Sequence, residues 1–524
     1  MQVVGDASTG HDVVDEFLLA ARAYPERPAI IRNGRELSYA DLAALVRAVA
    51  QRLGTRPGIV GVHATHSPGT IAGLLGVWAA GGTYCPVDPA FPAKRREAML
   101  AAAGCRTVLD AGPQPKSAAD VSLRILDRAG PDGSDELAYI LFTSGSTGEP
   151  KPVMTPRTAI AATVRSLREL FAITPADRVL QFAALNWDTC FEEILPALTG
   201  GASLVFHDDA YTGSFPRFLR MVESEQITVL DLPTAFWHEL VNYLFEEGAP
   251  LPECVRLVII GGEAANPARL ADWYALPAEH ARLVNTYGCT ETTLITHAID
   301  LHGPLAAHRR DQASRVPIGR PLPHVLEHVT DEGELLIGGP SLAAGYRGLP
   351  EATDARFVTV GAHRFFRTGD RVTRLPDGTL VHEGRVDDEV KIRGIRVDPA
   401  EVEAHIASHP AVSAVAVTGV RVADHTVLAA YVVPRPLVGT AGLSASIVDY
   451  LRDRVPAHLI PSRIRVVADL VYTASGKVDR HRTADQQSIV DRHSVVDRHS
   501  VVDQHRTIDR HRIVEQRRSE ETLP

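Results

Sequence analysis

The sequence predicts an α/β protein: a large N-terminal domain with parallel-rich sheets, followed by a small C-terminal α+β domain. Up to about residue 385, short apolar runs rich in Val, Ile and Leu alternate with helix-like stretches, as in parallel sheets covered by helices. After Gly384 the pattern changes to a shorter strand–turn–helix–strand unit. The length of 524 residues also suggests more than one domain. We expect domains at 1–385 and 386–480, and a separate tail at 481–524.

Several strands and a helix of the large domain can be assigned from their residue patterns. The stretch 214–226, "SFPRFLRMVESEQ", predicts a helix. Four apolar runs predict buried strands, namely "RVLQFAAL" (178–185), "ASLVFH" (202–207), "ITVLDLP" (227–233) and "RLVIIGGE" (256–263).

Residues 67–87, "SPGTIAGLLGVWAAGGTYCPV", carry no charge over a length that could cross a bilayer. The segment also holds five glycines and two prolines. These favour a buried helix, a Gly-Gly turn and a short strand over a membrane span.

Charge and cysteine usage narrow the class of function. A net charge of -10 argues against a broad nucleic-acid-binding surface. The five cysteines are scattered without a close pair, which argues against a disulfide framework or a zinc site and fits a reducing cytoplasm. The N-terminus lacks the basic-then-apolar layout of a signal peptide. We therefore expect a cytoplasmic protein with no nucleic-acid or membrane partner.

The C-terminal tail repeats a six-residue unit from Asp479, as in "DRHRTA", "DQQSIV" and "DRHSVV". A period of six gives no continuous apolar stripe on a helix, and histidines six apart lack the paired spacing of a metal site. An alternating strand or a stacked hexad solenoid stays open as an alternative. We predict a disordered or weakly helical low-complexity extension, whose role the sequence does not reveal.

The stretch 141–152, "LFTSGSTGEPKP", is a Gly/Ser/Thr loop that follows an apolar run and ends in a single lysine. Backbone N–H groups and hydroxyls in such a loop can converge on an anion, and Lys151 adds a mobile cation. The spacing differs from the common nucleotide loop, because Gly145 and Gly148 are three apart and Lys151 is followed by proline. Alone, the loop is only a weak signal, because Gly/Ser loops are often ordinary turns.

A series of motifs sets this loop in context. In chain order they are "LSYADL" (37–42), "GGTYCPVDP" (81–89), "TSGSTGEPK" (143–151), "NWDTCFEEILPAL" (186–198), "GGEA" (261–264), "NTYGCTETT" (285–293), "GELLIGGPSLAAGYRGLPEAT" (333–353), "FRTGD" (366–370), "GRVDDEVKIRGIRVDPAEVE" (384–403) and "ASGKVDR" (474–480). Over about residues 10–480 the series resembles the adenylate-forming superfamily, and within it the amino-acid adenylation domains of nonribosomal peptide synthetases. The resemblance implies that superfamily's fold, with the small domain as a lid. It also implies the reaction of a carboxylate with ATP to give an acyl-adenylate and pyrophosphate, followed by transfer of the acyl group to a thiol.

The resemblance implies how ATP and Mg²⁺ are bound. Tyr287 should pack on adenine, Thr290 should contact phosphate, and Glu291 should hold Mg²⁺, a hard cation that prefers oxygen ligands. Asp370 should accept both ribose hydroxyls, and Arg385 should also reach the ribose. The loop residues expected to hold the β- and γ-phosphates are Thr143, Ser144, Gly145, Ser146, Thr147, Gly148 and Lys151, and Gly262, Glu263 and Gly288 complete the ATP-binding set.

Three residues are expected to be catalytic: Lys477, Lys151 and Glu291. Lys477 matches the lysine that bridges the substrate carboxylate and the α-phosphate, where it would neutralise developing charge. Asp387 matches the hinge about which the small domain swings. In one position Lys477 serves adenylation, and in the other the "KIRGIRV" face serves thiol transfer.

The chain departs from the family at four positions. Pro152 stands where glycine is usual, Arg157 where histidine is usual, Cys289 where proline is usual, and Ser475 where asparagine is common. None of these changes removes a charged catalytic group. Pro152 restricts Lys151 toward extended backbone, with an effect on its motion that the sequence does not set.

The expected substrate is an amino acid with a basic side chain: lysine, β-lysine, ornithine or a shorter diamino acid. Asp188 matches the aspartate that pairs with the substrate α-ammonium, although it could also be a helix N-cap. Glu192 follows four residues later, on the same face of a helix, and Asp231 sits in an apolar strand run where an unpaired carboxylate is costly. Two further acids invite a second ammonium, and Gly261 leaves room for a long chain. Aligned without gaps, the pocket positions are Asp188, Thr189, Glu192, Asp231, Ile259, Gly261, Thr286, Leu294 and Ile295, with Lys477 completing the set.

Alternatives remain at the level of the sequence. Glu192 or Glu193 could face solvent and Asp231 could cap a neighbour, in which case the substrate is not basic. The chain could instead be an acyl- or aryl-CoA ligase of the same superfamily, or a degenerate binding protein whose tail recruits partners. No carrier-domain pattern follows residue 480, so the acceptor is expected to be a separate carrier protein with a phosphopantetheine thiol, or an amine. The sequence leaves open the product, any small activator protein and the oligomeric state.

Overall fold

A computed structural model describes residues 12–113, 120–126, 136–145, 149–306, 315–387, 389–392, 394–422, 425–436, 440–472 and 478–486. Nearly all of the hexad tail lies outside these residues. So do Lys477 and three residues of the predicted phosphate loop, Ser146, Thr147 and Gly148.

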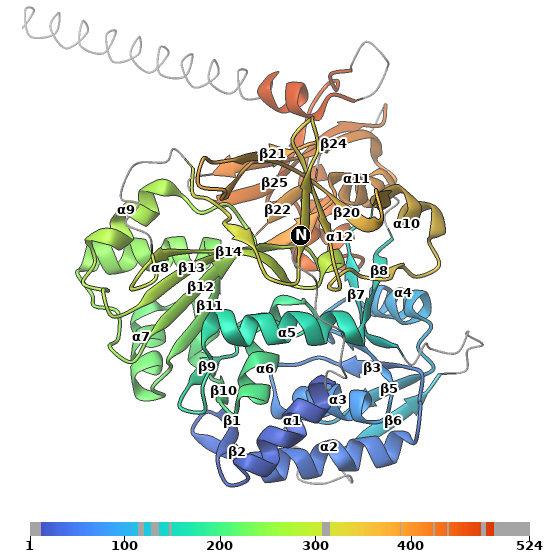
Figure 1. Cartoon of the computed structure of the whole chain (residues 1–524). Helices are drawn as coiled ribbons and strands as arrows, with labels where there is room; N and C mark the ends of the chain where they lie inside the picture. Colours follow the sequence, from blue (N-terminus) through green and yellow to red (C-terminus); the bar gives the residue numbers. More distant parts are fainter. Residues whose placement is uncertain are drawn as a thin grey trace, which may run out of the picture.

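The body of the large domain is built on two sheets (Figure 1). The larger is parallel through its centre and antiparallel at its edges, as the apolar runs predicted. Its nine strands, in spatial order, are β15 (Arg320–Pro321), β14 (Ile295–His302), β13 (Arg282–Gly288), β12 (Leu257–Gly261), β11 (Val229–Pro233), β9 (Arg178–Leu180), β10 (Ser203–Phe206), β1 (Pro28–Arg32) and β2 (Arg35–Ser38).

The second sheet has the same plan, with parallel central strands and antiparallel pairs at both ends. Its seven strands, in spatial order, are β18 (Gly345–Tyr346), β8 (Lys151–Pro156), β7 (Leu137–Thr143), β4 (Thr83–Val87), β3 (Ile59–His63), β5 (Thr107–Asp110) and β6 (Ser122–Ile125).

Helices cover both faces of these sheets, which explains why the central strands are apolar on both sides. One core joins buried residues of the two sheets to the helices α1 (Val13–Ala23), α2 (Tyr39–Leu53), α3 (Pro68–Ala79), α5 (Arg157–Phe171) and α6 (Thr189–Gly200). A second core lies on the opposite face of the nine-stranded sheet, against α7 (Phe215–Ser224), α8 (Thr234–Glu247) and α9 (Pro267–Ala275). α4 (Ala93–Ala103) packs on the outer face of the seven-stranded sheet.

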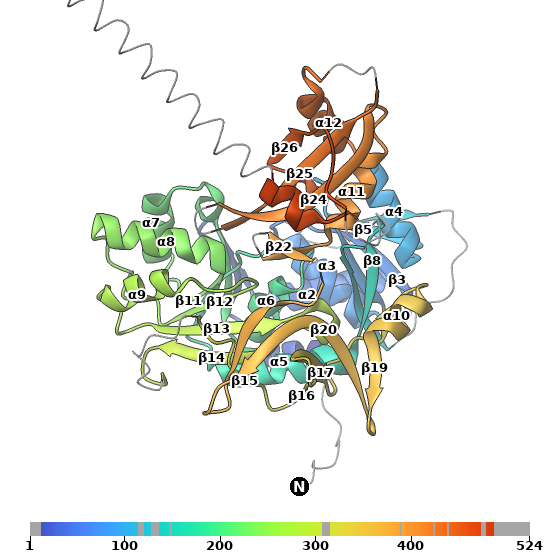
Figure 2. The same cartoon turned by 90° about the horizontal axis from the view of Figure 1, so that it is seen from above.

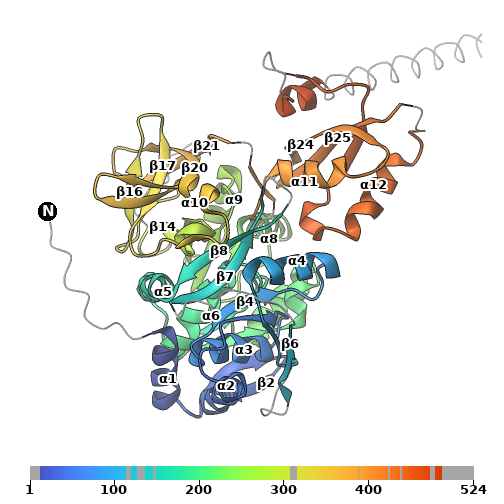
Figure 3. The same ribbon diagram turned by 90° about the vertical axis from the view of Figure 1, so that its right-hand side faces the viewer.

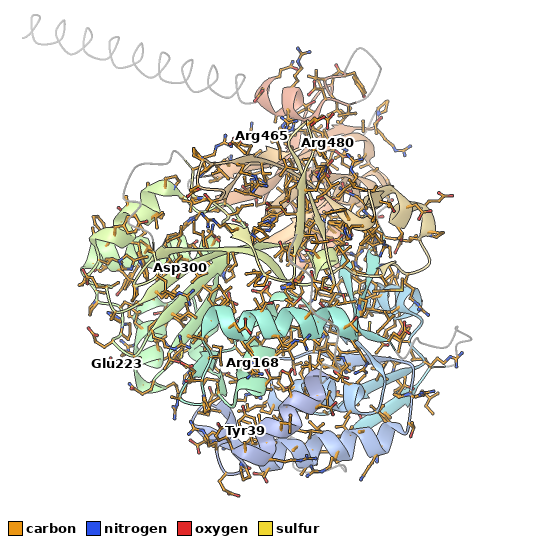
Figure 4. All side chains as sticks on the ribbon, in the orientation of Figure 1. Tyr39, Arg168, Glu223, Asp300, Arg465 and Arg480 are labelled. Carbon is orange, nitrogen blue, oxygen red and sulfur yellow. The ribbon has the colours of Figure 1, made fainter. Side chains whose placement is uncertain are left out.

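Contacts between helices close the base of the body. Tyr39, labelled in Figure 4, begins α2 and donates a hydrogen bond from its hydroxyl to the Ala202 carbonyl oxygen at 2.7 Å. Arg168, also labelled there, pairs with Glu16 at 3.1 Å and so ties α5 to α1.

The uncharged segment 67–87 has the predicted form. It consists of the buried helix α3, a turn at Gly81 and the buried strand β4. Among the residues that the structure describes, no helix is both long and apolar enough to cross a membrane.

An antiparallel sheet follows the body and curves along one side of it (Figure 2). Helix α10 (Pro350–Arg356) lies in the loop that leads to its edge strand β19. Its strands are β16 (Leu326–Val329), β17 (Glu334–Gly338), β20 (His363–Arg374) and β19 (Phe357–Val360), with β21 (Leu380–Arg385) paired to β20.

The small C-terminal domain forms a lobe of its own above the body (Figure 3). It opens with a hairpin of β22 (Val390–Ile392) and β23 (Ile395–Val397), continues into α11 (Pro399–Ala407), and ends in a sheet of β24 (Val412–Val422), β25 (His425–Pro434) and β26 (Arg463–Val466) covered by α12 (Leu443–Arg452). The predicted order of strand, turn, helix and strand is therefore correct. The domain boundary at residue 385 stays a prediction.

Candidate active site

A cavity of about 280 Å³ opens at the carboxyl ends of β11 and β12. In open α/β sheets this is the edge where ligands bind, because helices and loops leave a crevice there. The cavity wall brings together these predicted residues: Thr143, Asp188, Thr189, Glu192, Asp231, Gly261, Gly262, Thr286, Gly288, Thr290, Leu294, Ile295, Asp370 and Arg385. They come from segments far apart in the sequence.

Other predicted residues lie outside this wall. Ile259 is in the core beside Asp231, its register partner across β11 and β12. A neighbouring cavity of about 390 Å³ is lined by Glu263, Tyr287 and His382. It shares four residues with the first cavity, namely Gly262, Thr286, Gly288 and Lys391. The remaining described candidates that line neither cavity are Ser144, Gly145, Lys151, Glu291 and Asp387.

Three carboxyl groups face the first cavity, of which Asp231 is buried and Asp188 and Glu192 are partly buried. Asp188 is the N-cap of α6 and accepts a hydrogen bond from the Thr189 amide at 3.1 Å, so it both caps the helix and lines the pocket. Glu192 lies one turn further along α6, and Asp231 projects from β11 with 4% of its surface exposed. Glu192 and Asp231 are close enough to share a hydrogen bond.

Ionisation of these three carboxyl groups is unfavourable without a nearby cation. Burial raises the pKa of Asp188. Burial and the charge of Asp231 raise the pKa of Glu192 well above its usual range, and burial raises the pKa of Asp231 to about 7. Among the described residues, Asp231 Oδ2 has no hydrogen-bond partner. A buried carboxylate oxygen without a partner is rare, because its desolvation is then uncompensated.

Glu193 has a different environment from Glu192 beside it. Its carboxylate accepts hydrogen bonds from the Phe182 and Ala183 amides and from Gln181 Nε2, each at 2.9 Å. Glu193 therefore ties α6 to the chain that follows β9 and does not line the pocket. The sequence placed two adjacent glutamates on one helix, and only packing separates their roles.

Gly261 does not leave free space in the direction of a side chain. A Cβ there would lie 2.5 Å from Thr286 Oγ1, whose hydroxyl donates to the Ile260 carbonyl oxygen at 2.9 Å. Glycine at 261 is required by the close approach of Thr286, and this packing does not support the sequence argument for a long side chain.

The predicted ribose-binding residues form a connected network. Asp370 accepts hydrogen bonds from the Tyr287 hydroxyl at 2.6 Å and from Arg385 Nη1 at 2.9 Å, and its Oδ1 lies 3.1 Å from His382 Nε2. Burial opposes ionisation of Asp370. The bond from His382 and the charges of Lys391 and Arg385 outweigh it and hold the pKa far below its usual range.

The predicted phosphate loop connects the antiparallel strands β7 and β8, with Thr143 and Lys151 paired across its base. Lys151 Nζ lies 5.8 Å from the centre of the Tyr346 ring. Pro152 follows in β8, where its carbonyl oxygen accepts from the Arg347 amide at 2.8 Å. Arg157, at the family's histidine position, bonds Asp12 at 2.8 Å and the Gly82 carbonyl oxygen at 2.7 Å. It thus has a structural contact of its own.

The small domain docks directly on this loop. Ser144 Oγ donates to the Arg396 carbonyl oxygen and accepts from the Asp398 amide, both at 2.9 Å. Gly145 N donates to Glu401 Oε2 at 3.2 Å, and Glu401 also pairs with Arg95 at 2.7 Å. The "KIRGIRV" hairpin therefore lies over the cavity, to which it contributes four residues that were not in the predicted site, namely Lys391, Gly394, Ile395 and Arg396.

A ligand crevice at the ends of a parallel sheet, a Gly/Ser/Thr loop beside it and a C-terminal lobe docked over both define a two-domain adenylate-forming enzyme. The chain belongs to the AMP-binding enzyme family. The family model for AMP-binding enzymes matches residues 17–347, and the model for the C-terminal domain of these enzymes matches residues 401–477. The chain is thus an ATP-dependent adenylating ligase, as the motifs predicted.

Similar proteins narrow the family further. The isonitrile lipopeptide synthase of Streptomyces coeruleorubidus is 39% identical over 480 residues, which cover 87% of this chain and 32% of that protein. This chain therefore spans about a third of that relative. An artificially fused adenylation–PCP di-domain nonribosomal peptide synthetase from Klebsiella oxytoca is similar in structure, with a TM-score of 0.74, 27% identity, and coverage of 88% of this chain and 94% of that one. A malonyl-CoA ligase complex has a TM-score of 0.71 and 27% identity, covering 85% of this chain and 97% of that one.

Proposed function

We propose that this chain activates an amino acid with a basic side chain and passes it to the thiol of a carrier protein, or to an amine acceptor. In the first step a carboxylate oxygen of the amino acid attacks the α-phosphate of ATP, and pyrophosphate leaves. In the second step the acceptor attacks the acyl carbon, and AMP leaves. The observation that carries the substrate class is the group of three carboxyl groups, Asp188, Glu192 and Asp231, around one cavity.

The charge of the cavity supports two ammonium groups on the substrate. Asp188 would pair with the α-ammonium, at the end of the cavity that also holds Thr290. Glu192 and Asp231 would share the side-chain ammonium, since their proximity makes the pair costly to ionise without a cation between them. The unpartnered Asp231 Oδ2 is the acceptor that such a group would satisfy.

The nucleotide would lie on the side of the cavity toward Asp370. The Tyr287 ring would stack on adenine, and Asp370 would accept the ribose hydroxyls with Arg385 beside it. For this, the hydroxyl of Tyr287 must release Asp370 Oδ2, which it now occupies at 2.6 Å. The amides and hydroxyls of the loop from Thr143 to Gly148, with Lys151, would hold the leaving pyrophosphate.

Glu291 fits a magnesium ligand. It is a fully buried carboxylate, and a charge there requires a cation nearby. No group of three or more His, Cys, Asp or Glu side chains arranged to hold a metal occurs in the described part of the chain. Mg²⁺ is usually held by one or two carboxylates together with substrate phosphates, so Glu291 would bind it with ATP. There Mg²⁺ would neutralise the charge of the phosphates as pyrophosphate leaves.

The docked hairpin supports assignment of this conformation to the transfer step. A small cavity of about 30 Å³ lies between the two domains and is lined by Phe91, Thr143, Trp187 and His458. Phe91 and Trp187 give it apolar surface and His458 a polar group, which suit the uncharged, amide-containing arm of a phosphopantetheine thiol, and the cavity would have to widen for the arm to enter along this path.

The experiment is ATP–pyrophosphate exchange over a panel of acids. Lysine, β-lysine, ornithine and 2,4-diaminobutyrate should support exchange, whereas leucine and glutamine should support it weakly. Exchange only with fatty or aryl acids would assign the chain to the CoA ligases, and absence of exchange with every acid would indicate a binding protein. If the wild-type enzyme preferred neutral amino acids, the basic substrate class would be wrong.

A further inference from the structure

Tyr346 contacts two of the charged groups that the proposed reaction uses, Glu291 and Lys151. Its hydroxyl donates to Glu291 Oε1 at 2.8 Å, and Arg396 pairs with the same carboxylate at 3.2 Å. Lys151 Nζ lies over the Tyr346 ring, 5.8 Å from the ring centre. An ammonium within about 6 Å of an aromatic ring centre is attracted to the face of the ring. One side chain therefore touches a carboxylate and an ammonium that come from distant parts of the sequence.

The backbone around Tyr346 is fixed to the same two parts of the chain. β18, which holds Tyr346, pairs with β8, and the Arg347 amide donates to the Pro152 carbonyl oxygen at 2.8 Å. On the other side, the Ala343 amide donates to the Glu291 carbonyl oxygen at 2.9 Å. This short segment thus joins the strand after the phosphate loop to the turn after β13.

The side chain of Tyr346 is held firmly in this position. It is 3% exposed and meets the Phe357 ring edge-on, with 5.9 Å between the ring centres. The Tyr346 amide donates to Thr353 Oγ1 at 3.0 Å. A side chain locked by packing and hydrogen bonds can hold the groups that it contacts in a precise geometry. Packing requires only the ring, so the hydroxyl directed at a buried carboxylate is the part of Tyr346 that packing does not explain.

The two contacts would act on different parts of the pyrophosphate site. A carboxylate that binds a metal is oriented by hydrogen bonds from the groups behind it, and loss of such a partner weakens metal binding about 10- to 100-fold. The ring face would hold the ammonium of Lys151, which stands on a flexible four-carbon stem. Tyr346 would thus set the spacing between the carboxylate that binds Mg²⁺ and the ammonium that contacts phosphate oxygens.

We propose that Tyr346 is a positioning residue for the departure of pyrophosphate: its hydroxyl orients Glu291 for Mg²⁺, and its ring places Lys151 for the β- and γ-phosphates. This proposal rests on the proposed function, because it takes Glu291 as the metal ligand and Lys151 as a phosphate ligand. It gives a role to the tyrosine of "LAAGYRGLP", which belongs to one of the motifs of the chain but was not among the expected site residues.

Calorimetric binding of inorganic pyrophosphate to the full chain tests the proposal without turnover. Tyr346→Phe keeps the ring and removes only the hydroxyl. It should weaken binding of pyrophosphate in excess Mg²⁺ about tenfold and leave binding of pyrophosphate with a chelator unchanged. Tyr346→Leu should also weaken binding with the chelator, about fivefold, because Lys151 loses the ring face. Tyr39→Phe, which removes another buried hydroxyl with a hydrogen bond, is the matched control and should bind both forms as wild type does.

Three results would overturn the proposal. In the first, Tyr346→Phe binds pyrophosphate in Mg²⁺ as tightly as wild type, which would make Tyr346 a packing residue alone. In the second, Tyr346→Phe loses affinity equally with Mg²⁺ and with the chelator, which would indicate a general disturbance of the loop. In the third, Mg²⁺ does not tighten pyrophosphate binding to wild type, so that Glu291 is not a metal ligand.

ATP–pyrophosphate exchange separates these results from failure of the proposed function. In Tyr346→Phe the kcat for exchange should fall about tenfold, while KM for the amino acid stays as in wild type. If wild type supports exchange and Tyr346→Phe has the same kcat, the positioning role is wrong and the proposed function stands. If no acid supports exchange in wild type, the proposed function fails, and pyrophosphate binding still decides the role of Tyr346.

Discussion

Two pairs of carboxyl groups in the candidate active site differ in their surroundings. On the proposed amino-acid side, Glu192 and Asp231 lie next to each other, and burial raises the pKa values of both. On the proposed nucleotide side, Asp370 lies near Arg385, His382 and Lys391, and Glu389 lies among arginines. The pKa values of both acids are lowered, that of Glu389 to about 2. For Glu389, burial raises the pKa, but the charge and hydrogen bonds of Arg396 outweigh it.

The difference indicates how each side receives its ligand. Among the residues that the structure describes, no basic side chain pairs with Glu192 or Asp231, so a substrate that carries a second ammonium would supply the missing partner. The nucleotide side already contains its cations, and its carboxylates must exchange partners when ATP and metal enter. Under the proposed function, the first side would select the substrate. The second side includes Glu389, which pairs with Arg385 next to the start of the small domain.

Loss of the Asp188 carboxylate should reduce amino-acid activation more than any other change on this side of the cavity. Asp188→Asn keeps the size of the side chain and its capping oxygen but removes the partner of the α-ammonium that every amino acid carries. We expect kcat/KM for ATP–pyrophosphate exchange to fall at least about 100-fold for all amino acids, as when one partner of a buried charge pair is lost. Asp469→Asn, at an exposed position, is the control. Near-normal exchange in Asp188→Asn would leave Asp188 with the role of a helix cap alone.

Neutralising the other two acids should change preference rather than activity. In Glu192→Gln and in Asp231→Asn, the preference for lysine-like acids over neutral ones should fall about 10- to 100-fold. The double variant should lose less than the product of the two effects, because both acids would share one ammonium. The panel of acids used for wild type measures this. An unchanged substrate profile in both variants would show that these residues do not contact the side chain.

The amino-acid side of this comparison could be predicted because the resemblance to adenylation domains, aligned without gaps, placed Asp188, Glu192 and Asp231 in one pocket. Helical periodicity supported the pairing of Asp188 with Glu192, and the cost of burying Asp231 supported its place in the pocket. The pairing of Glu291 with Arg396 could not be predicted, since it depends on how two domains dock. The packing of Gly261 against Thr286 was also missed, because the types of residue in the sequence do not show how closely a side chain of one strand approaches the backbone of the next.

Glu192 and Glu193, adjacent on α6, are expected to differ in role: the first in substrate choice, the second in stability. Glu193→Ala should leave the substrate profile unchanged, since Glu193 does not line the cavity. It removes the acceptor of the Phe182 and Ala183 amides, and we expect a loss of about 2 kcal/mol in the free energy of unfolding. The shift of the thermal unfolding midpoint measures this loss. Glu192→Ala is the matched control, with a changed profile and little loss of stability. The reverse result would exchange the roles of the two residues.

The smallest expected effect is the dependence of stability on pH. It tells whether the acidic pair of the pocket ionises near neutral pH or stays protonated. Burial raises the pKa of Asp231 to about 7 in the free protein, against about 3.9 in an unfolded chain. The folded state therefore holds its proton more tightly. The stability this contributes is complete below about pH 4 and is lost as the pH rises through about 7. Relative to Asp231→Asn, wild type should thus become less stable to denaturant across that range.

Substrate binding should follow the opposite trend. As the pair ionises it gains the charge that attracts a side-chain ammonium, so KM for a basic amino acid should fall about threefold between about pH 6 and pH 8. For a neutral amino acid KM should not fall, and in Asp231→Asn the trend should be lost. A KM that falls equally for basic and neutral acids would place the titrating group outside the side-chain pocket. The proton on this pair would then have no part in choosing the substrate.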